Sequence, residues 1–100
     1  MNQEQCICAA IQLPNGEVWR GHRHHNAIYA ASQAGADPRG RIDGFITSLN
    51  RFVDRREGMK IQRAAGIQSV DPHSPPTATE LFSEDLYLRD WRSPERAGVA

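Results

Sequence analysis

Long apolar runs are missing from this sequence of 100 residues. No run approaches the roughly 18 to 20 residues that a membrane-spanning helix needs, and the first residues lack the basic region of a signal peptide. These absences favour a cytoplasmic protein over a membrane or secreted one. A hydrophobic content of 39% suffices for one modest core, so we expect residues 1–100 to form a single domain.

Cysteine is scarce as well, because only Cys6 and Cys8 occur. A bridge between residues i and i+2 would be strained, so the pair does not predict a disulfide-stabilised secreted domain. A metal site could combine these thiols with His22, His24 or His25, but the spacing matches no familiar zinc module. We therefore expect neither a metal nor a cofactor.

Net charge is also absent, since twelve basic residues balance twelve acidic ones. A protein that coats long nucleic acid needs a strongly basic surface, so that class is not expected. The charges are unevenly distributed: residues 17–70 carry nine basic and five acidic groups, and residues 71–100 carry three and six. Eleven of the twelve cations are arginine. Its guanidinium binds phosphate or carboxylate through two parallel hydrogen bonds, although a GC-rich coding sequence would produce the same bias.

Turn signals predict a β-hairpin near the N-terminus. The pair Asn15-Gly16 separates the apolar stretch 7–13 from residues 17–20, and Asn-Gly is a strong hairpin signal. Strict alternation places Ile7 on one face of the first strand and Cys6 on the other. Both faces are apolar, so we expect this strand to be central or covered.

Further elements follow from capping and turn residues. Asp54 is a good N-cap, and Glu57 stands three residues later, as in a capping box. Gly35 and Gly66 are placed to end the helices that precede them. The expected elements are a helix over 27–34, paired strands over 44–47 and 51–53, and a helix over 55–65.

The C-terminal third is less regular. Three prolines predict a loop over 69–79. Residues 81–88 fit either a short helix or a strand followed by a turn, and 89–100 resemble a flexible tail. The whole pattern predicts an α+β fold, in which two to three helices lie on one side of a small antiparallel sheet.

The first candidate site is the polar stretch 20–25, which carries two arginines and three histidines. It lies where a strand leads into a helix, and the start of a helix offers unpaired amides and a partial positive charge. Arg23 and His24 would bind phosphate there. The alternative is an ordinary polar junction at the surface.

The second candidate site combines a strand and a helix start. Phe45 could stack on a nucleobase, while Thr47, Arg55 and Arg56 could reach phosphate. The alternative places Phe45 in the core and the two arginines in a solvated first turn.

The third candidate is the acidic stretch 81–87, which contains Glu84 and Asp85. Carboxylates in an arginine-rich protein commonly pair with its arginines, within one chain or between subunits. The alternative is a direct role, in which they accept hydrogen bonds from ribose hydroxyls or from a base amine.

Catalysis is the less favoured function. A cysteine and histidine pair, or a two-histidine phosphodiesterase site, needs nucleophile, base and orienting groups in one pocket. The paired His-x-Thr/Ser motif of cyclic phosphodiesterases is absent. We expect a binding protein, with a cyclic-nucleotide phosphodiesterase that uses His22, His24 and His25 as the alternative.

The order of these motifs resembles a family of small bacteriophage proteins, the Thoeris anti-defence sponges. The resemblance covers about residues 7–88 and rests on five motifs that follow an Ala-Ala-rich hairpin: Arg-Gly-His-Arg-His from 20, Gly-Phe-Ile-Thr from 44, Arg-Phe-Val-Asp-Arg-Arg-Glu-Gly from 51, Ala-Ala-Gly from 64, and Ser-Glu-Asp-Leu-Tyr from 83. Members of that family sequester cyclic ADP-ribose-type signals.

The resemblance implies a homo-oligomer built from dimers, with a pocket between subunits that captures a cyclic ADP-ribose isomer without cleaving it. It implies inhibition of bacterial anti-phage defence in the host cytoplasm, and in some members separate sites for cyclic di- or trinucleotides. The alternative outside enzymes is a phage accessory protein that binds a host protein or DNA. The ligand-binding positions would be Arg23, His24, Phe45, Thr47, Arg55 and Arg56.

Overall fold

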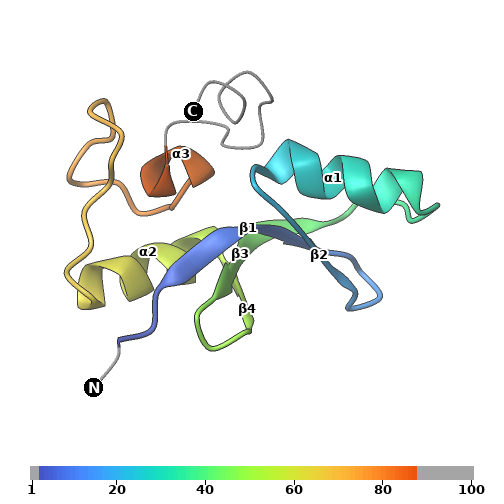
Figure 1. Cartoon of the computed structure of the whole chain (residues 1–100), viewed down its shortest axis with the longest axis horizontal. Helices are drawn as coiled ribbons and strands as arrows, with labels where there is room; N and C mark the ends of the chain where they lie inside the picture. Colours follow the sequence, from blue (N-terminus) through green and yellow to red (C-terminus); the bar gives the residue numbers. More distant parts are fainter. Residues whose placement is uncertain (1–2, 88–100) are drawn as a thin grey trace, which may run out of the picture.

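A four-stranded antiparallel sheet with three helices makes up the fold in a computed structural model that describes residues 3–87 (Figure 1). The strand order is β2-β1-β3-β4. This architecture confirms the predicted α+β class. The elements are β1 (Cys6–Gln12), β2 (Val18–Gly21), α1 (His24–Gln33), β3 (Ile42–Thr47), β4 (Phe52–Asp54), α2 (Arg55–Ala64) and α3 (Ser83–Leu86).

The N-terminal hairpin forms where the Asn-Gly turn predicts it. In β1 and β2, Ala9 lies opposite Gly21, and the turn is closed by the amide of Leu13, which donates to the Glu17 carbonyl at 2.8 Å. β3 pairs with the other edge of β1. β1 is therefore a central strand, as its apolar faces predict.

A β-bulge corrects the predicted orientation of the first residues of β1. Cys6 lies opposite Thr47, whereas Cys8 lies opposite Ile46, so the register shifts between the two cysteines. Cys6 is consequently buried in the core, and Ile7 is 51% exposed. The prediction that Ile7 shares a face with Ile11, and Cys6 with Cys8, was wrong because an extra residue in one strand reverses the alternation beyond it.

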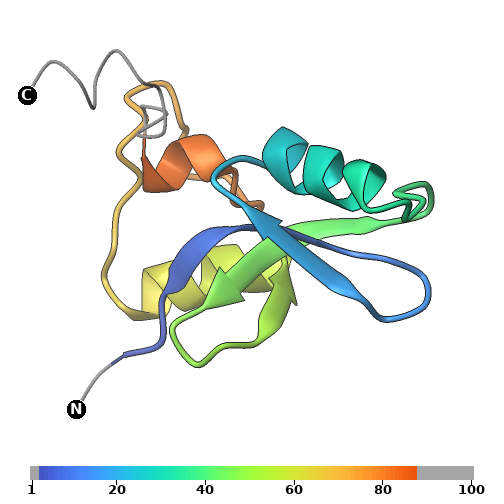
Figure 2. The ribbon, with the colours of Figure 1, turned by 45° about the vertical axis from the view of Figure 1, so that its right-hand side comes forward.

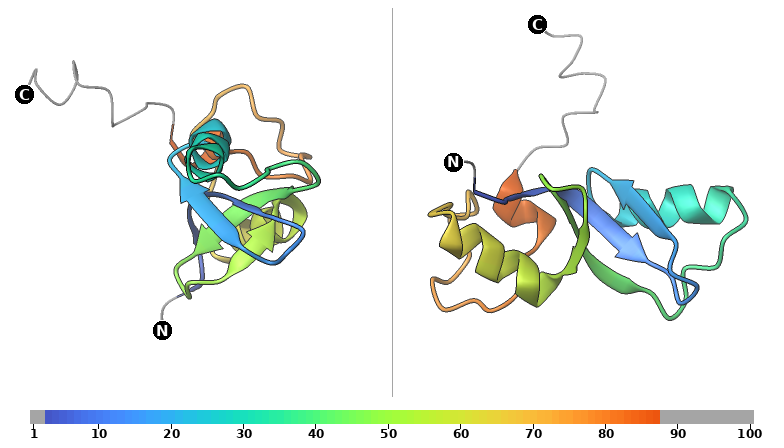
Figure 3. Two further views of the ribbon diagram at one scale, coloured as in Figure 1. Left: turned by 90° about the vertical axis from the view of Figure 1, so that its right-hand side faces the viewer. Right: turned by 90° about the horizontal axis from the view of Figure 1, so that it is seen from below.

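The three helices cover one face of the sheet. Figure 2 shows α2 behind the strands and α1 along their upper side, and Figure 3 gives two further views of this arrangement. α1 packs on β1 and β2, α2 on β3 and β4, and α3 against β1. Two apolar clusters lie between the layers: Ile11, Leu13, Ala27 and Ala31 under α1, and Cys6, Phe45, Val53, Met59, Ile61 and Leu81 under α2.

α2 begins as its capping residues predict. The Asp54 side chain accepts a hydrogen bond from the Glu57 amide at 2.8 Å, which satisfies one of the free amides of the first turn. Because Asp54 is also the last residue of β4, the strand passes into the helix without a loop. The first residue of α2 is thus fixed against the sheet.

The C-terminal segment resolves the alternative left open by the sequence, since residues 83–86 form a helix. Asp85 stabilises its start by accepting a hydrogen bond from the Phe82 amide at 2.8 Å. The predicted tail over 89–100 lies outside the described residues. Across residues 3–87, no helix is long and apolar enough to cross a membrane.

Candidate anion-binding site

The start of α1 positions the first pair of candidate residues. The helix begins at His24, three residues earlier than predicted, because the Asn26 side chain accepts a hydrogen bond from the Arg23 amide at 2.9 Å. This local bond offsets the modest helix propensity of His and Asn. Arg23 and His24 therefore lie at the helix entrance instead of in a preceding loop.

His24 is held over the sheet by its imidazole. Its Nε2 lies 2.8 Å from the Gly44 carbonyl and donates to it, because a carbonyl can only accept. The ring also packs edge-on against Phe45, with centroids 5.2 Å apart. Burial lowers the pKa of His24, although the bond to Gly44 opposes that shift. The imidazole is therefore neutral at pH 7 and positions the α1 start on β3.

Arg55 extends from the first residue of α2 toward the same region. Its Nη2 lies 3.4 Å from Asp43 on β3, and its guanidinium lies over the Phe82 ring, 4.4 Å from the centroid. The side chain is 20% exposed. Its Nη1 also lies 3.5 Å from the Leu81 carbonyl, to which it donates. A guanidinium supported by an aromatic face and held by two long contacts could exchange them for shorter ones to an anion.

Arg23 reaches the same region from the α1 side. Its Nη1 lies 3.2 Å from the Ser83 hydroxyl and 3.8 Å from the Glu84 carboxylate. The guanidinium also lies 5.2 Å from the centroid of the Tyr87 ring. These partners come from residues 83–87, so the C-terminal segment closes over this arginine. Only 11% of the Arg23 side chain is exposed.

The two helix starts and β3 thus form one cluster, which we call the Arg23–Arg55 site. It consists of Arg23, His24 and Arg55 with the carboxylates of Asp43 and Glu84. His24 lies within the electrostatic influence of Arg55, Asp43 and Glu84, and it follows Arg23 in the chain. The ion pairs of the two arginines are long, so an anion with several oxygens could compete with both carboxylates.

A comparison with known protein families shows which family the chain belongs to. A sequence profile of the phage T4 y16D protein family matches residues 5–87. The chain belongs to this family. No curated protein and no solved structure matches it. The phage character expected from the motif resemblance is therefore confirmed, and the y16D description adds no ligand or activity.

Two of the remaining predicted site residues are structural in this y16D-family chain. Phe45 is fully buried and packs in the apolar cluster under α2, so its ring offers no face to a nucleobase. Thr47 is 2% exposed, and its hydroxyl donates to Glu4 at 2.6 Å. Alternation along β3 turns both side chains toward the helices, so the structure does not bring them to the Arg23–Arg55 site, and Phe45 takes the core position that was its alternative.

Arg56 lies apart from the site. Its side chain is 74% exposed and lies 3.9 Å from the Glu80 carboxylate. Successive residues of a helix point about 100° apart, so Arg55 and Arg56 cannot face the same ligand from one turn. The sequence also missed Asp43 and the ring of Phe82, because only the fold brings them beside Arg55.

The groups that could carry catalysis are dispersed. His22 is 6% exposed and stacks on Tyr87 with centroids 4.1 Å apart, His24 binds a backbone carbonyl, and His25 is exposed. Burial raises the pKa of Cys6 to about 12 and also raises that of Cys8. Both thiols are consequently protonated at neutral pH and poorly nucleophilic. Within residues 3–87, no three His, Cys, Asp or Glu side chains gather in a geometry that could hold a metal.

Proposed function

We propose that this phage protein binds a small phosphate-bearing signal at the Arg23–Arg55 site and sequesters it without cleaving it. The ligand class that we favour is a cyclic nucleotide immune signal, in the form of a cyclic ADP-ribose isomer. Its capture would inhibit a bacterial anti-phage defence from within the host cytoplasm. Membership in a phage family supports a phage accessory role, and the motif resemblance supports the signal.

The observation that carries the proposal is that Arg23 and Arg55, from two different helix starts, both contact residues 81–84. Their carboxylate partners lie at 3.8 and 3.4 Å, beyond the roughly 2.7 to 2.9 Å of a strong charge-assisted hydrogen bond. A pyrophosphate offers oxygens at two positions and could take both guanidiniums at short distance. The partial positive charge of each helix start would add to this attraction.

Binding is favoured over catalysis by the state of the nearby groups. His24 is neutral and its Nε2 is engaged by the sheet. A general base or acid must exchange a proton with the substrate, so an imidazole held on a backbone carbonyl is poorly placed for that role. A protein that only sequesters its ligand needs hydrogen-bond donors that match the ligand, in a site that lacks a nucleophile.

We further propose that the protein acts as a homo-oligomer built from dimers, with the ligand held between subunits. The sheet face opposite the helices supports self-association, because Val18 and Ile42 lie on it and are 40% and 51% exposed. A second subunit that covers the sheet would remove these side chains from water. The position of the ligand between subunits follows from the motif resemblance alone. Size-exclusion chromatography with light scattering measures the mass directly.

The test is capture and release. The purified protein is incubated with cyclic ADP-ribose isomers, unbound ligand is removed, and the protein is denatured by heat. We expect the intact isomer in the supernatant in a stoichiometric amount. Recovery of a linear, hydrolysed product would instead establish the alternative phosphodiesterase, which His24→Ala should then inactivate. Absence of any bound nucleotide, with capture of a host protein, would contradict both.

A further inference from the structure

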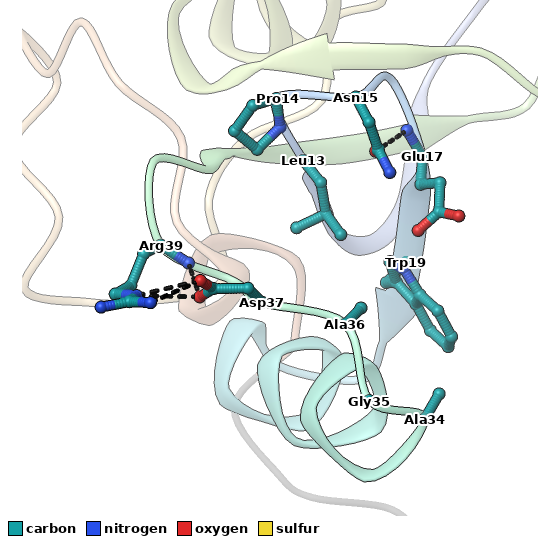
Figure 4. Close-up of a pocket in the computed structure, with 10 residues that line it drawn as sticks. All are labelled: Leu13, Pro14, Asn15, Glu17, Trp19, Ala34, Gly35, Ala36, Asp37 and Arg39. Carbon is teal, nitrogen blue, oxygen red and sulfur yellow. Dashed lines mark hydrogen bonds and ion pairs between the residues drawn. The ribbon is translucent and has the colours of Figure 1, made fainter.

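The sheet face opposite the helices, which we call the open face, carries few polar side chains. Trp19 lines a hollow together with the turn that follows α1 (Figure 4), so its neighbours in β2 point away from the helices. Residues directly opposite in a sheet lie on the same side, which extends the open face across the other strands. It consists of Cys8, Ala10, Gln12, Val18, Arg20, Ile42, Gly44, Ile46, Phe52 and Asp54. Three of these ten are strongly polar, whereas the free face of an antiparallel sheet is commonly polar along its length.

One row of residues across the open face has opposite charges at its two ends. Ala10 lies opposite Arg20 on one side and Gly44 on the other, and Gly44 lies opposite Asp54. Both charged residues are exposed. The Arg20 side chain lies along the face, because its Nη2 is 3.3 Å from the side-chain oxygen of Asn50 in the turn after β3. Three strand spacings, about 14 Å in all, separate the backbones of the two charged residues, so they cannot pair within one chain.

A second copy of the chain matches this row in one orientation. Two sheets pack face to face about 10 Å apart, with their strands nearly aligned. A two-fold axis parallel to the strands places β2 of one copy over β4 of the other, so Arg20 of each copy faces Asp54 of the other. A two-fold axis that runs along the row instead places β2 over β2, where like charges meet. The charges therefore select the axis parallel to the strands.

We infer that the open face binds a second copy of the chain in this orientation, as a symmetric sandwich of two sheets with two Arg20–Asp54 ion pairs. The contact would remove the exposed side chains of Val18 and Ile42 from water. Oδ1 of Asp54 caps α2, and a carboxylate has a second oxygen that can accept from the partner. The inference rests on the proposed self-association and names its surface. It does not depend on the ligand, because the Arg23–Arg55 site lies on the helix side of the sheet.

Exchange of charge between two variants tests this pairing. Arg20→Glu places like charges opposite each other in a dimer of that variant, and so does Asp54→Lys. We expect each change alone to raise the dimer dissociation constant at least about a hundredfold in sedimentation equilibrium. An equimolar mixture of the two variants brings opposite charges together at both pairs, so we expect a heterodimer, identified by its mass in native mass spectrometry. Two folded variants that stay monomeric when mixed would overturn the inference.

Two further variants separate the role of charge from that of folding. Asp54→Asn keeps an oxygen that can cap α2 but removes the charge, and we expect the dissociation constant to rise roughly tenfold. Arg56→Glu makes the same charge change as Arg20→Glu at an exposed position of α2, and should alter the constant by less than about twofold.

The outcomes distinguish this inference from the proposals on which it builds. A dimer that neither Arg20→Glu nor Asp54→Asn weakens would use another surface, which overturns the inference and retains the proposed self-association. A natural chain that is monomeric at every concentration would overturn both and leave the open face to a different partner. Sequestration is decided separately, by the capture and heat release of the nucleotide.

Discussion

Two arginine clusters near opposite ends of β3 differ in how their cations are held. Near the last residue of the strand, Arg51 binds Glu4 through two hydrogen bonds of 2.7 and 2.8 Å, and Thr47 completes the carboxylate shell. Near its start, Arg55 and Arg23 have carboxylate neighbours at 3.4 and 3.8 Å. In the first arrangement, a short two-point ion pair holds the guanidinium and serves the fold. In the second, the ion pairs are longer, and we propose that an external anion competes with these carboxylates.

The largest expected effect tests this contrast by removing the loosely held arginines. Arg23→Ala or Arg55→Ala should weaken capture of a cyclic ADP-ribose isomer by about a hundredfold in titration calorimetry, because each deletes a charged donor to phosphate. Arg55→Lys, which keeps the charge but loses the planar fork, should also bind more weakly than the natural chain.

Arg51→Ala and Arg56→Ala are the matched controls. Each removes one positive charge from the arginine-rich stretch 17–70, so they test whether overall charge or position determines affinity. We expect ligand affinity within about twofold of the natural chain, as for a screened surface charge. A loss of ligand affinity as large as that of Arg55→Ala would show that the two arginine clusters do not differ in binding.

Phe45 and Phe82 provide a second contrast, between a core ring and a ring at the site. Phe45→Ala should lower the free energy of unfolding by about 3 to 5 kcal/mol in urea titrations. Phe82 is 46% exposed beneath Arg55, so Phe82→Ala should cost less than about 1 kcal/mol and act mainly on ligand affinity. Equal losses of stability from both would show that the fold depends on both rings alike.

Local signals predicted most of the fold. The turn at Asn15-Gly16 and the cap at Asp54 act within four residues, so the sequence contains the whole interaction. The bulge after Cys6 was missed because it depends on pairing with a strand about forty residues away. The helical form of 83–86 was undecided because the carboxylate of Asp85 can support either a turn or a helix start.

The site was predicted only in part, for the same reason. Arg23, His24 and Arg55 stand beside predicted helix starts, so their character as helix-end cations was visible in the sequence. Their proximity in the fold could not be predicted from the sequence. It depends on the antiparallel strand order, which places Gly44 between the two helix starts. Phe45 was misassigned because a buried and a ligand-facing aromatic ring have the same local sequence.

The pH dependence of stability separates His24 from the Glu4 cluster. Burial lowers the pKa of His24 from 6.5 in the fold, so the unfolded chain binds the proton more readily. This contribution to stability is present above pH 6.5 and is lost as the pH falls toward the folded pKa. We expect a lower urea midpoint at pH 5.5 than at 7.5, with a smaller difference in His24→Gln. His25→Gln, at an exposed neighbour, should keep the full difference.

The smallest expected effect concerns Glu4. The hydrogen bonds from Arg51 and Thr47 lower its pKa below 4.5, so its contribution to stability is present above that pH and is lost as the pH falls further. Glu4→Gln should therefore unfold at slightly lower urea than the natural chain at pH 6, and the two should converge near pH 3. A constant gap across this range would mean that Glu4 acts by packing instead of by charge.

The bare backbone at Gly44 sets the spacing of the whole site. A Cβ atom there would collide with the Val53 carbonyl and lie 2.7 Å from the Phe52 ring. Any side chain would push β4 outward, and α2 would move with it because the strand passes directly into the helix. The separation of the two arginines thus depends on the lack of a side chain at position 44. Position 44 consequently sets the width of the Arg23–Arg55 site, and an alanine there would move the two arginines apart without replacing either of them.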